Sequence, residues 1–125
     1  MSEFFVPIEP MPAPRPRFSR NGHAYTEPKY AAFKEGMAEW ITSNVSRIDY
    51  TTAPVSVTLE FVRTRPRTSK LAYPAGDLDN YAKGCLDAAT QSQVVWLDDK
   101  QVIALTLSKK WGTPAGVRFD IRALD

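Results

Sequence analysis

The sequence predicts a single domain of the α/β or α+β class, in which a small mixed sheet of about four strands is covered by two main helices. Its 125 residues, 43% of them hydrophobic, suffice for one core that buries about two-thirds of the surface of the unfolded chain. Hydrophobic residues alternate with polar ones in the expected strands and recur every three or four positions in the expected helices. No repeat or linker divides the chain, so residues 1–125 are expected to form one domain.

Strands are expected where hydrophobic and polar residues alternate. Residues 3–9 are expected to form a short strand, and Pro7 places it at a sheet edge because proline donates no backbone hydrogen bond. The period-2 pattern predicts three more strands, at residues 55–62, 102–108 and 117–123. A short turn separates the last two, so the simplest expectation is that they pair with each other as a hairpin.

Two helices are expected from hydrophobic residues spaced three and four positions apart. The first covers residues 28–44, with Thr26 as its N-cap. The second covers residues 79–92 and begins with Asp79 near its N-cap. The expected order of elements is therefore strand, helix, strand, helix, strand, strand.

The composition excludes several classes of protein. The single cysteine cannot form an intramolecular disulfide, and the N-terminus lacks the pattern of a secretory leader. No stretch approaches the roughly 20 apolar residues of a membrane-spanning helix. With 16 basic and 14 acidic residues the net charge is only +2, so charge-driven disorder is not expected. We therefore expect a cytoplasmic protein that makes no membrane contact.

The charges are segregated along the chain although the net charge is small. A first basic strip contains Arg63, Arg65, Arg67 and Lys70 and no acid. A second basic strip contains Lys100, Lys109, Lys110 and Arg118 and no acid. Residues 76–99, between the strips, carry five acids and one lysine. This arrangement suits a cation at the centre and a polyanion around it, although solvated basic faces beside an acidic helix would give the same composition.

A loop rich in proline precedes the first helix, at residues 10–22, and it adds three further cations: Arg15, Arg17 and Arg20. A loop of this length in a small domain is more often functional than passive. Together with the first strip it supplies the seven residues expected to contact nucleic acid, which are Arg15, Arg17, Arg20, Arg63, Arg65, Arg67 and Lys70.

The acidic centre has a spacing suited to metal-dependent chemistry. Asp77 and Asp79 converge on one side of an extended segment ahead of the second helix, and Lys83 lies one turn beyond Asp79. Carboxylates this close repel one another unless a divalent cation neutralises them. Mg²⁺ fits because it prefers oxygen ligands and is usually held by one or two carboxylates together with phosphate oxygens. The pattern predicts metal-dependent hydrolysis of nucleic acid phosphodiesters, with Lys83 neutralising charge on the phosphoryl oxygens.

Each of these residues also has a simpler structural interpretation. Asp79 is a good N-cap, Asp77 an ordinary loop residue, and Lys83 a solvent-exposed partner of Asp79. The pair Asp98 and Asp99 is consistent with a turn between strands. Taken one at a time these interpretations are favoured. Taken together they leave the acids and the basic strips unrelated, which favours the catalytic hypothesis.

The motif DLDNYAKGCLDAA followed by VWLDDKQV resembles the RusA family of Holliday junction resolvases over about residues 74–103. The sequence signature of the family begins with Asp-Leu-Asp-Asn, followed by a lysine four residues after the second aspartate and an aspartate four residues after that lysine. It ends with a hydrophobic-Asp-Asp-x-Gln-Val/Ile segment. The resemblance implies a RusA-like fold and a homodimeric, Mg²⁺-dependent endonuclease, with Mn²⁺ as a substitute ion, that nicks four-way DNA junctions symmetrically. Matched by position, it implies Asp77, Asp79 and Asp99 as acidic metal-site residues and Lys83 as the catalytic lysine.

The resemblance leaves one position open. The link from the second helix to the aspartate pair, residues 90–95, is one residue longer than in the family pattern, so counting from Asp77 does not separate Asp98 from Asp99. Adjacent residues on an extended segment face opposite ways, so one of the two is expected to point at the metal. Alignment of the family pattern through Trp96 favours Asp99 as the residue that points at the metal.

Three classes of function compete on this sequence. The leading hypothesis is a junction resolvase that works as a homodimer, since two symmetric nicks need two sites and one chain carries one acidic cluster. A junction-binding protein without catalysis would keep the arginine-rich loop but would not require the three aspartates and Lys83 together. A metal-binding or structural interaction domain would not require the basic strips.

Overall fold

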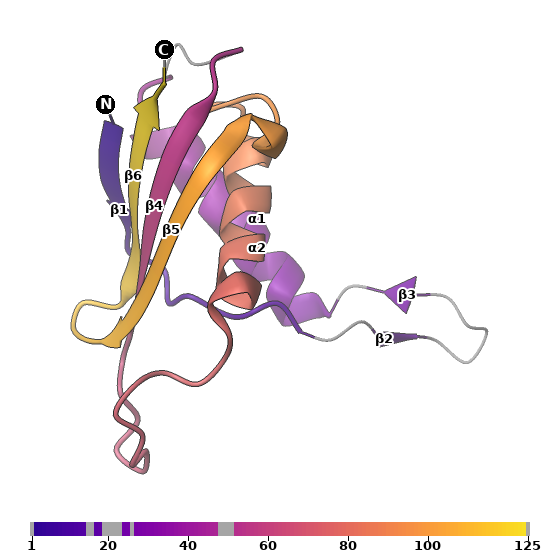
Figure 1. The fold of residues 1–125 in the computed structure, drawn as a ribbon. Coiled ribbons are helices and arrows are strands. Elements are labelled where there is room, and N and C mark those ends of the chain that lie inside the picture. Colours follow the sequence, from indigo (N-terminus) through magenta and orange to yellow (C-terminus); the bar gives the residue numbers. More distant parts are fainter. Residues whose placement is uncertain (1, 15–16, 19–23, 26, 48–51, 125) are drawn as a thin grey trace.

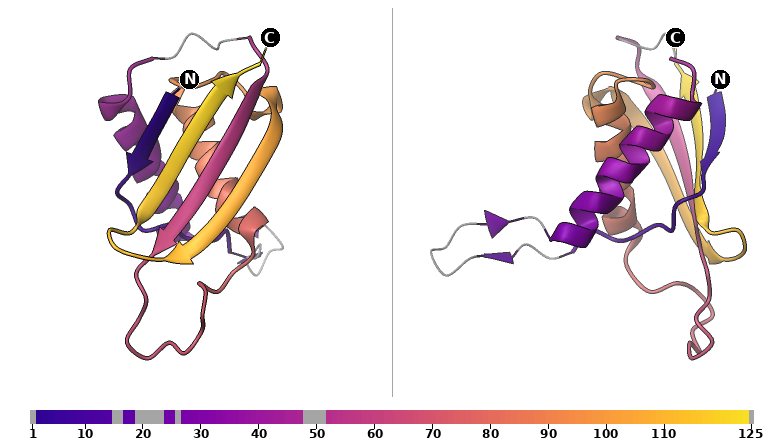
Figure 2. Two further views of the ribbon diagram at one scale, coloured as in Figure 1. Left: turned by 60° about the vertical axis from the view of Figure 1, so that its left-hand side comes forward. Right: turned by 180° about the vertical axis from the view of Figure 1, so that it is seen from behind.

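The computed structural model describes residues 2–14, 17–18, 24–25, 27–47 and 52–124, and it has the expected α+β architecture. Two helices, α1 (Pro28–Asn44) and α2 (Leu78–Ser92), lie on one face of a four-stranded mixed sheet (Figure 1, Figure 2). The strands of this sheet are β1 (Ser2–Val6), β4 (Val55–Arg63), β5 (Val102–Trp111) and β6 (Gly116–Ala123). Two shorter strands, β2 (Arg17–Phe18) and β3 (Ala24–Tyr25), pair with each other away from this sheet.

The order of strands in the sheet is β1-β6-β4-β5, so the predicted hairpin between the last two strands is wrong. Strand β4 lies between them, parallel to β5 and antiparallel to β6, and β6 is in turn antiparallel to β1. The reason is that α2 carries the chain from the end of β4 back to the start of β5. The two strands then run parallel as neighbours, which leaves the other side of β4 free for β6.

Several strand ends and helix caps differ from the expected ones, including the end of β5, which extends to Trp111 instead of residue 108. The first strand ends at Val6 instead of residue 9, directly before Pro7. Helix α1 has Glu27 as its N-cap, whose carboxylate accepts hydrogen bonds from the backbone N–H groups of Lys29 and Tyr30, both at 3.1 Å. The predicted cap, Thr26, lies outside the described residues. Helix α2 has Asp77 as its N-cap, so Asp79 lies inside the first turn.

The core lies between the two helices and the inner face of the sheet. Alternate residues of β4 point into it, and all four are fully buried: Val55, Val57, Leu59 and Phe61. Trp96 is also buried and donates its indole N–H to the Thr90 hydroxyl at 2.8 Å. Cys85 is buried in the same core, as expected from the apolar face of α2, and burial raises the pKa of its thiol. Among the described residues no helix is long and apolar enough to span a bilayer.

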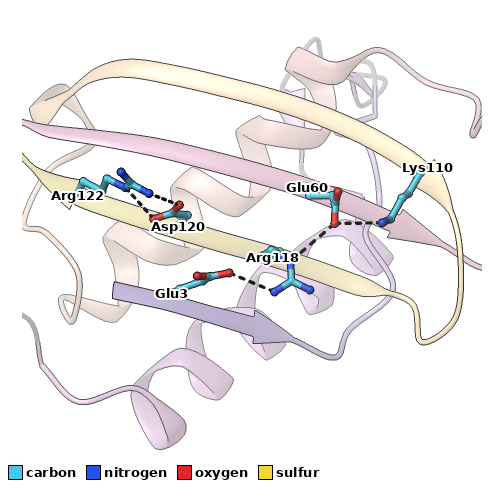
Figure 3. A network of polar contacts seen from close by, with 6 residues as sticks. All are labelled: Glu3, Glu60, Lys110, Arg118, Asp120 and Arg122. Carbon is cyan, nitrogen blue, oxygen red and sulfur yellow. Dashed lines mark hydrogen bonds and ion pairs between the residues drawn. The ribbon is translucent and has the colours of Figure 1, made fainter. Parts of the chain in front are cut away.

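The outer face of the sheet is polar and its charges are paired (Figure 3). Glu60 contacts both Lys110, at 3.5 Å, and Arg118, at 3.8 Å, and Arg118 also contacts Glu3 at 3.3 Å. Lys109 is paired in register with the buried Phe61 and so shares the inner face. The second basic strip is therefore not one surface, because adjacent strand residues point to opposite faces. Two of its four cations, Lys110 and Arg118, also form ion pairs with acids.

Candidate active site

Helix α2 starts directly after a constrained glycine. Gly76 has a φ of 100°, a left-handed conformation that favours glycine, and a Cβ there would lie 3.0 Å from the buried Tyr81 ring. The Tyr81 hydroxyl donates to the carbonyl of Ala75 at 2.5 Å, and Lys109 Nζ donates to the carbonyl of Gly76 at 2.6 Å. These contacts fix the backbone that presents Asp77.

Asp77 occupies the N-cap position of α2 without capping the helix with its side chain. Its backbone carbonyl accepts the first helical bonds, from the N–H groups of Asn80 and Tyr81, but its carboxylate accepts none. The carboxylate is exposed and lies at the positive end of the helix dipole. It is therefore available to an external ligand, which the carboxylate of a capping residue such as Glu27 is not.

A groove of about 280 Å³ lies between α2 and the inner face of β5. Four charged residues line it, Asp79, Lys83, Asp87 and Asp99, and its apolar wall is made by Ala82, Leu86, Leu105 and Leu107. Three of the charged residues come from one face of α2 and the fourth from the short 3-10 turn η1 (Asp99–Gln101) that leads into β5. The structure thus brings three of the four predicted catalytic residues into one groove, with Asp77 at the start of the same helix.

The two adjacent aspartates before β5 have different environments. The Asp98 carboxylate caps η1 by accepting from the backbone N–H of Lys100 at 2.9 Å, and the Gln101 side chain accepts from the backbone N–H of Asp98 at 3.1 Å in return. This reciprocal capping box occupies Asp98. Asp99 lines the groove instead. Asp99 is therefore the residue of the pair that faces the groove, and its role as a metal ligand stays a prediction.

The electrostatic environment of Asp99 disfavours its negative charge. Its pKa is raised, first by partial loss of solvent and then by the charges of Asp98 and Asp87, with a further contribution from a hydrogen bond with Asp98. A cation in the groove would relieve this repulsion.

The oxygen donors at the start of α2 fit a hard divalent cation, but the described residues do not gather a complete set of ligands around them. No three acidic, histidine or cysteine side chains of the described part of the chain gather closely enough to hold one ion. Asp77 and Asp79 are two such donors. Asp87, whose charge acts on Asp99, is two turns along α2, roughly 12 Å, from Asp79. Lys83 makes no ion pair with Asp77 or Asp79 among the contacts of the described residues.

Sequence reasoning did not include Asp87 among the site residues. Asp87 lines the groove, is half-buried, and forms a 3.8 Å ion pair with Lys34 of α1. The signal for it was present, because Asp79, Lys83 and Asp87 are spaced by four and so share one face of a helix.

The seven residues expected to bind nucleic acid fall into three groups. Arg65, Arg67 and Lys70 are exposed in the loop that leads from β4 into α2. Arg63 is held within the protein, with its guanidinium 3.5 Å from Glu9 and donating to the Tyr81 hydroxyl at 3.1 Å. Arg15 and Arg20 lie outside the described residues, and for Arg17 only the backbone, in β2, is described.

An acidic groove with one lysine, on an α+β fold of this size that also carries an exposed basic loop, is the arrangement expected of a nuclease that uses a metal ion to cleave a phosphate backbone. Comparison with known families makes the class specific: residues 7–122 match the family model of the endodeoxyribonuclease RusA. The chain therefore belongs to the RusA family of endodeoxyribonucleases, which resolve Holliday junctions in DNA recombination and repair and depend on a metal ion. No curated protein matches the chain significantly.

Proposed function

We propose that this chain resolves four-way DNA junctions by Mg²⁺-dependent hydrolysis, with Asp77, Asp79 and Asp99 as acidic ligands and Lys83 as the catalytic lysine. The observation that carries the assignment is the state of the Asp77 carboxylate, which sits at an N-cap and yet bonds to nothing in its helix. Asp79 and Lys83 follow on the same helix and face the groove that Asp99 also lines, from the turn η1 before β5.

Asp77 and Asp79 would hold the ion, because Mg²⁺ usually takes one or two carboxylates and completes its shell with water and substrate phosphate oxygens. Such an ion supplies an activated water and stabilises the leaving oxygen. Asp99 is the third acidic ligand of the proposal. It comes from η1, whereas Asp77 and Asp79 lie at the start of α2, so it is the decisive residue to test. Mn²⁺ is expected to substitute for Mg²⁺ because it prefers the same hard oxygen ligands.

Lys83 has no acid partner in the described structure, so its ammonium is free to approach the substrate. On an exposed face of α2 between Asp79 and Asp87, it would neutralise the charge that develops on the phosphoryl oxygens. The exposed Arg65, Arg67 and Lys70 would contact the flanking phosphates.

We further propose that the active form is a homodimer. Two symmetric nicks require two sites, and one chain carries one groove. Strand β5 supports self-association, because it is an edge of the sheet and Ile103 on it is 63% exposed. Exposed apolar edge strands are normally covered by another chain or element. A dimer mass in light scattering at micromolar concentration is the expected result, and a monomer mass both free and on junction DNA would exclude this mechanism.

The function is tested by incubating a labelled four-way junction with the protein and Mg²⁺, beside a linear duplex of the same sequence and a reaction containing EDTA. We expect paired nicks in the junction only, and none with EDTA. Asp77→Asn, Asp79→Asn and Asp99→Asn should each abolish nicking while junction binding persists. Asp120→Asn, the same change on the opposite face of the sheet, is the matched control and should nick normally. Normal nicking by all three site variants would remove the proposed metal site.

A further inference from the structure

Two large apolar side chains are exposed shortly before Asp77. Tyr73 is 58% exposed and Leu71 is 46% exposed, both in the loop that joins β4 to α2 (Figure 1). Single exposed apolar side chains are common on protein surfaces and need no explanation. These two differ because the segment that carries them is held in one conformation and leads directly into the site.

Three side chains from other elements hold this segment by its carbonyl groups. The Trp111 indole N–H donates to the carbonyl of Leu71 at 3.0 Å. The next two contacts are those already described, from Tyr81 to Ala75 and from Lys109 to Gly76. Donors from α2 and β5 therefore fix both ends of residues 71–76, so Tyr73 is presented at little further cost in conformational entropy.

The Tyr73 ring also has a cation beside it. Lys109 Nζ lies 5.3 Å from the ring centroid, within the range of a cation–π contact. Lys109 therefore contacts both the ring and the carbonyl of Gly76, the residue before Asp77. The position of the ring is thereby coupled to the position of the first site aspartate.

We propose that the Tyr73 ring is a stacking platform for an unstacked base at the branch point, and that it makes the enzyme prefer a junction to a duplex. The proposal rests on the junction-cleaving function proposed above. Stacking on an aromatic ring accepts any base but needs one that is free of its neighbour. The interior of a duplex offers no such base, whereas a base pair at the branch point has one face on which its stack ends. The exposed Arg65, Arg67 and Lys70 of the same loop contact phosphates, which both substrates possess.

The test compares equilibrium binding of the full-length protein to a four-way junction and to a duplex, with EDTA present so that no cleavage occurs. Tyr73→Ala should lose roughly 5- to 150-fold in junction affinity, the range that base stacking gives, and less than about twofold in duplex affinity. Tyr73→Phe keeps the ring and should bind both as the wild type does. Arg67→Ala should weaken both complexes by the same factor, because it removes a phosphate contact.

A second readout reports on the base itself. A junction with 2-aminopurine at the branch point should change its fluorescence on binding the wild type and Tyr73→Phe, and should not do so on binding Tyr73→Ala. Equal losses on junction and duplex, or no loss on either, would overturn the proposal. Wild-type protein that nicks junctions with Mg²⁺ while Tyr73→Ala keeps its selectivity would refute the stacking role alone. Wild-type protein that neither nicks nor prefers junctions would instead refute the proposed function.

Discussion

Asp98 and Asp99 are adjacent, and the structure predicts that substituting them affects different properties. Replacing Asp98 by alanine removes the acceptor for the Lys100 N–H and one half of the reciprocal pair with Gln101. Loss of an N-cap costs about 1 kcal/mol, which in a domain of this size lowers Tm by about 4 °C. Asp98→Asn should cost much less, because asparagine caps helices about as well as aspartate.

Asp99→Asn should leave stability unchanged or slightly raised, because its charge is opposed by Asp98 and Asp87. Nicking should respond in the reverse order: Asp99→Asn loses it, whereas Asp98→Asn retains it. Urea denaturation measures the first property, and single-turnover cleavage of a labelled junction with Mg²⁺ measures the second. If Asp98→Asn lost cleavage and Asp99→Asn kept it, the assignment of the capping and metal-binding roles would be reversed.

Three further predictions concern the helices and the segment before the site. Lys83→Met should lower single-turnover cleavage by roughly 100-fold with little change in junction affinity, and weaker binding at an unchanged rate would make Lys83 a phosphate anchor instead. Gly76→Ala should destabilise the fold by about 1–2 kcal/mol in urea denaturation, because alanine disfavours the left-handed conformation; an unchanged midpoint would contradict the reasoning. Burial, with a smaller contribution from Asp87, raises the pKa of Tyr30 to about 12. Between pH 10 and 12 the folded state therefore keeps a proton on Tyr30 that the unfolded state loses. The free energy of unfolding should fall as the pH rises through this range. Tyr30→Phe should remove the part of this loss of stability that Tyr30 causes. Identical profiles of stability against pH for the wild type and Tyr30→Phe would contradict this role of Tyr30.

The sequence predicted local structure well where a short pattern determines it. The bounds of α1, residues 28–44, were predicted correctly because Pro28 and the spacing of its apolar residues mark both the start and the buried face. The N-cap of α1 was assigned to Thr26 because short polar residues are the usual caps. In the structure the longer Glu27 side chain instead reaches forward to the N–H groups of Lys29 and Tyr30. Which strands are neighbours was not predictable in this way, since alternation marks a strand without identifying its partner.

At the candidate site the sequence predicted Asp77, Asp79, Lys83 and Asp99 but not Asp87, and their catalytic roles stay predictions. The spacing of Asp77, Asp79 and Lys83 placed them correctly on and before one helix. That the Asp98 side chain caps η1 and is thereby occupied depends on capping geometry, which counting residues does not reveal. The second basic strip was defined by counting charges along the chain, which does not show on which face each side chain lies. The alternation of β5 already implied that Lys109 and Lys110 point to opposite faces.

The free carboxylate at the start of α2 places stability and activity in conflict at one position. Serine or threonine at residue 77 would cap the helix and gain about 1 kcal/mol, because the backbone there already has the extended conformation of a cap. Selection for thermal stability alone would therefore favour losing Asp77, and with it the proposed metal ligand. Efforts to stabilise this enzyme should hold residue 77 fixed and seek their gains on the outer face of the sheet, away from the groove.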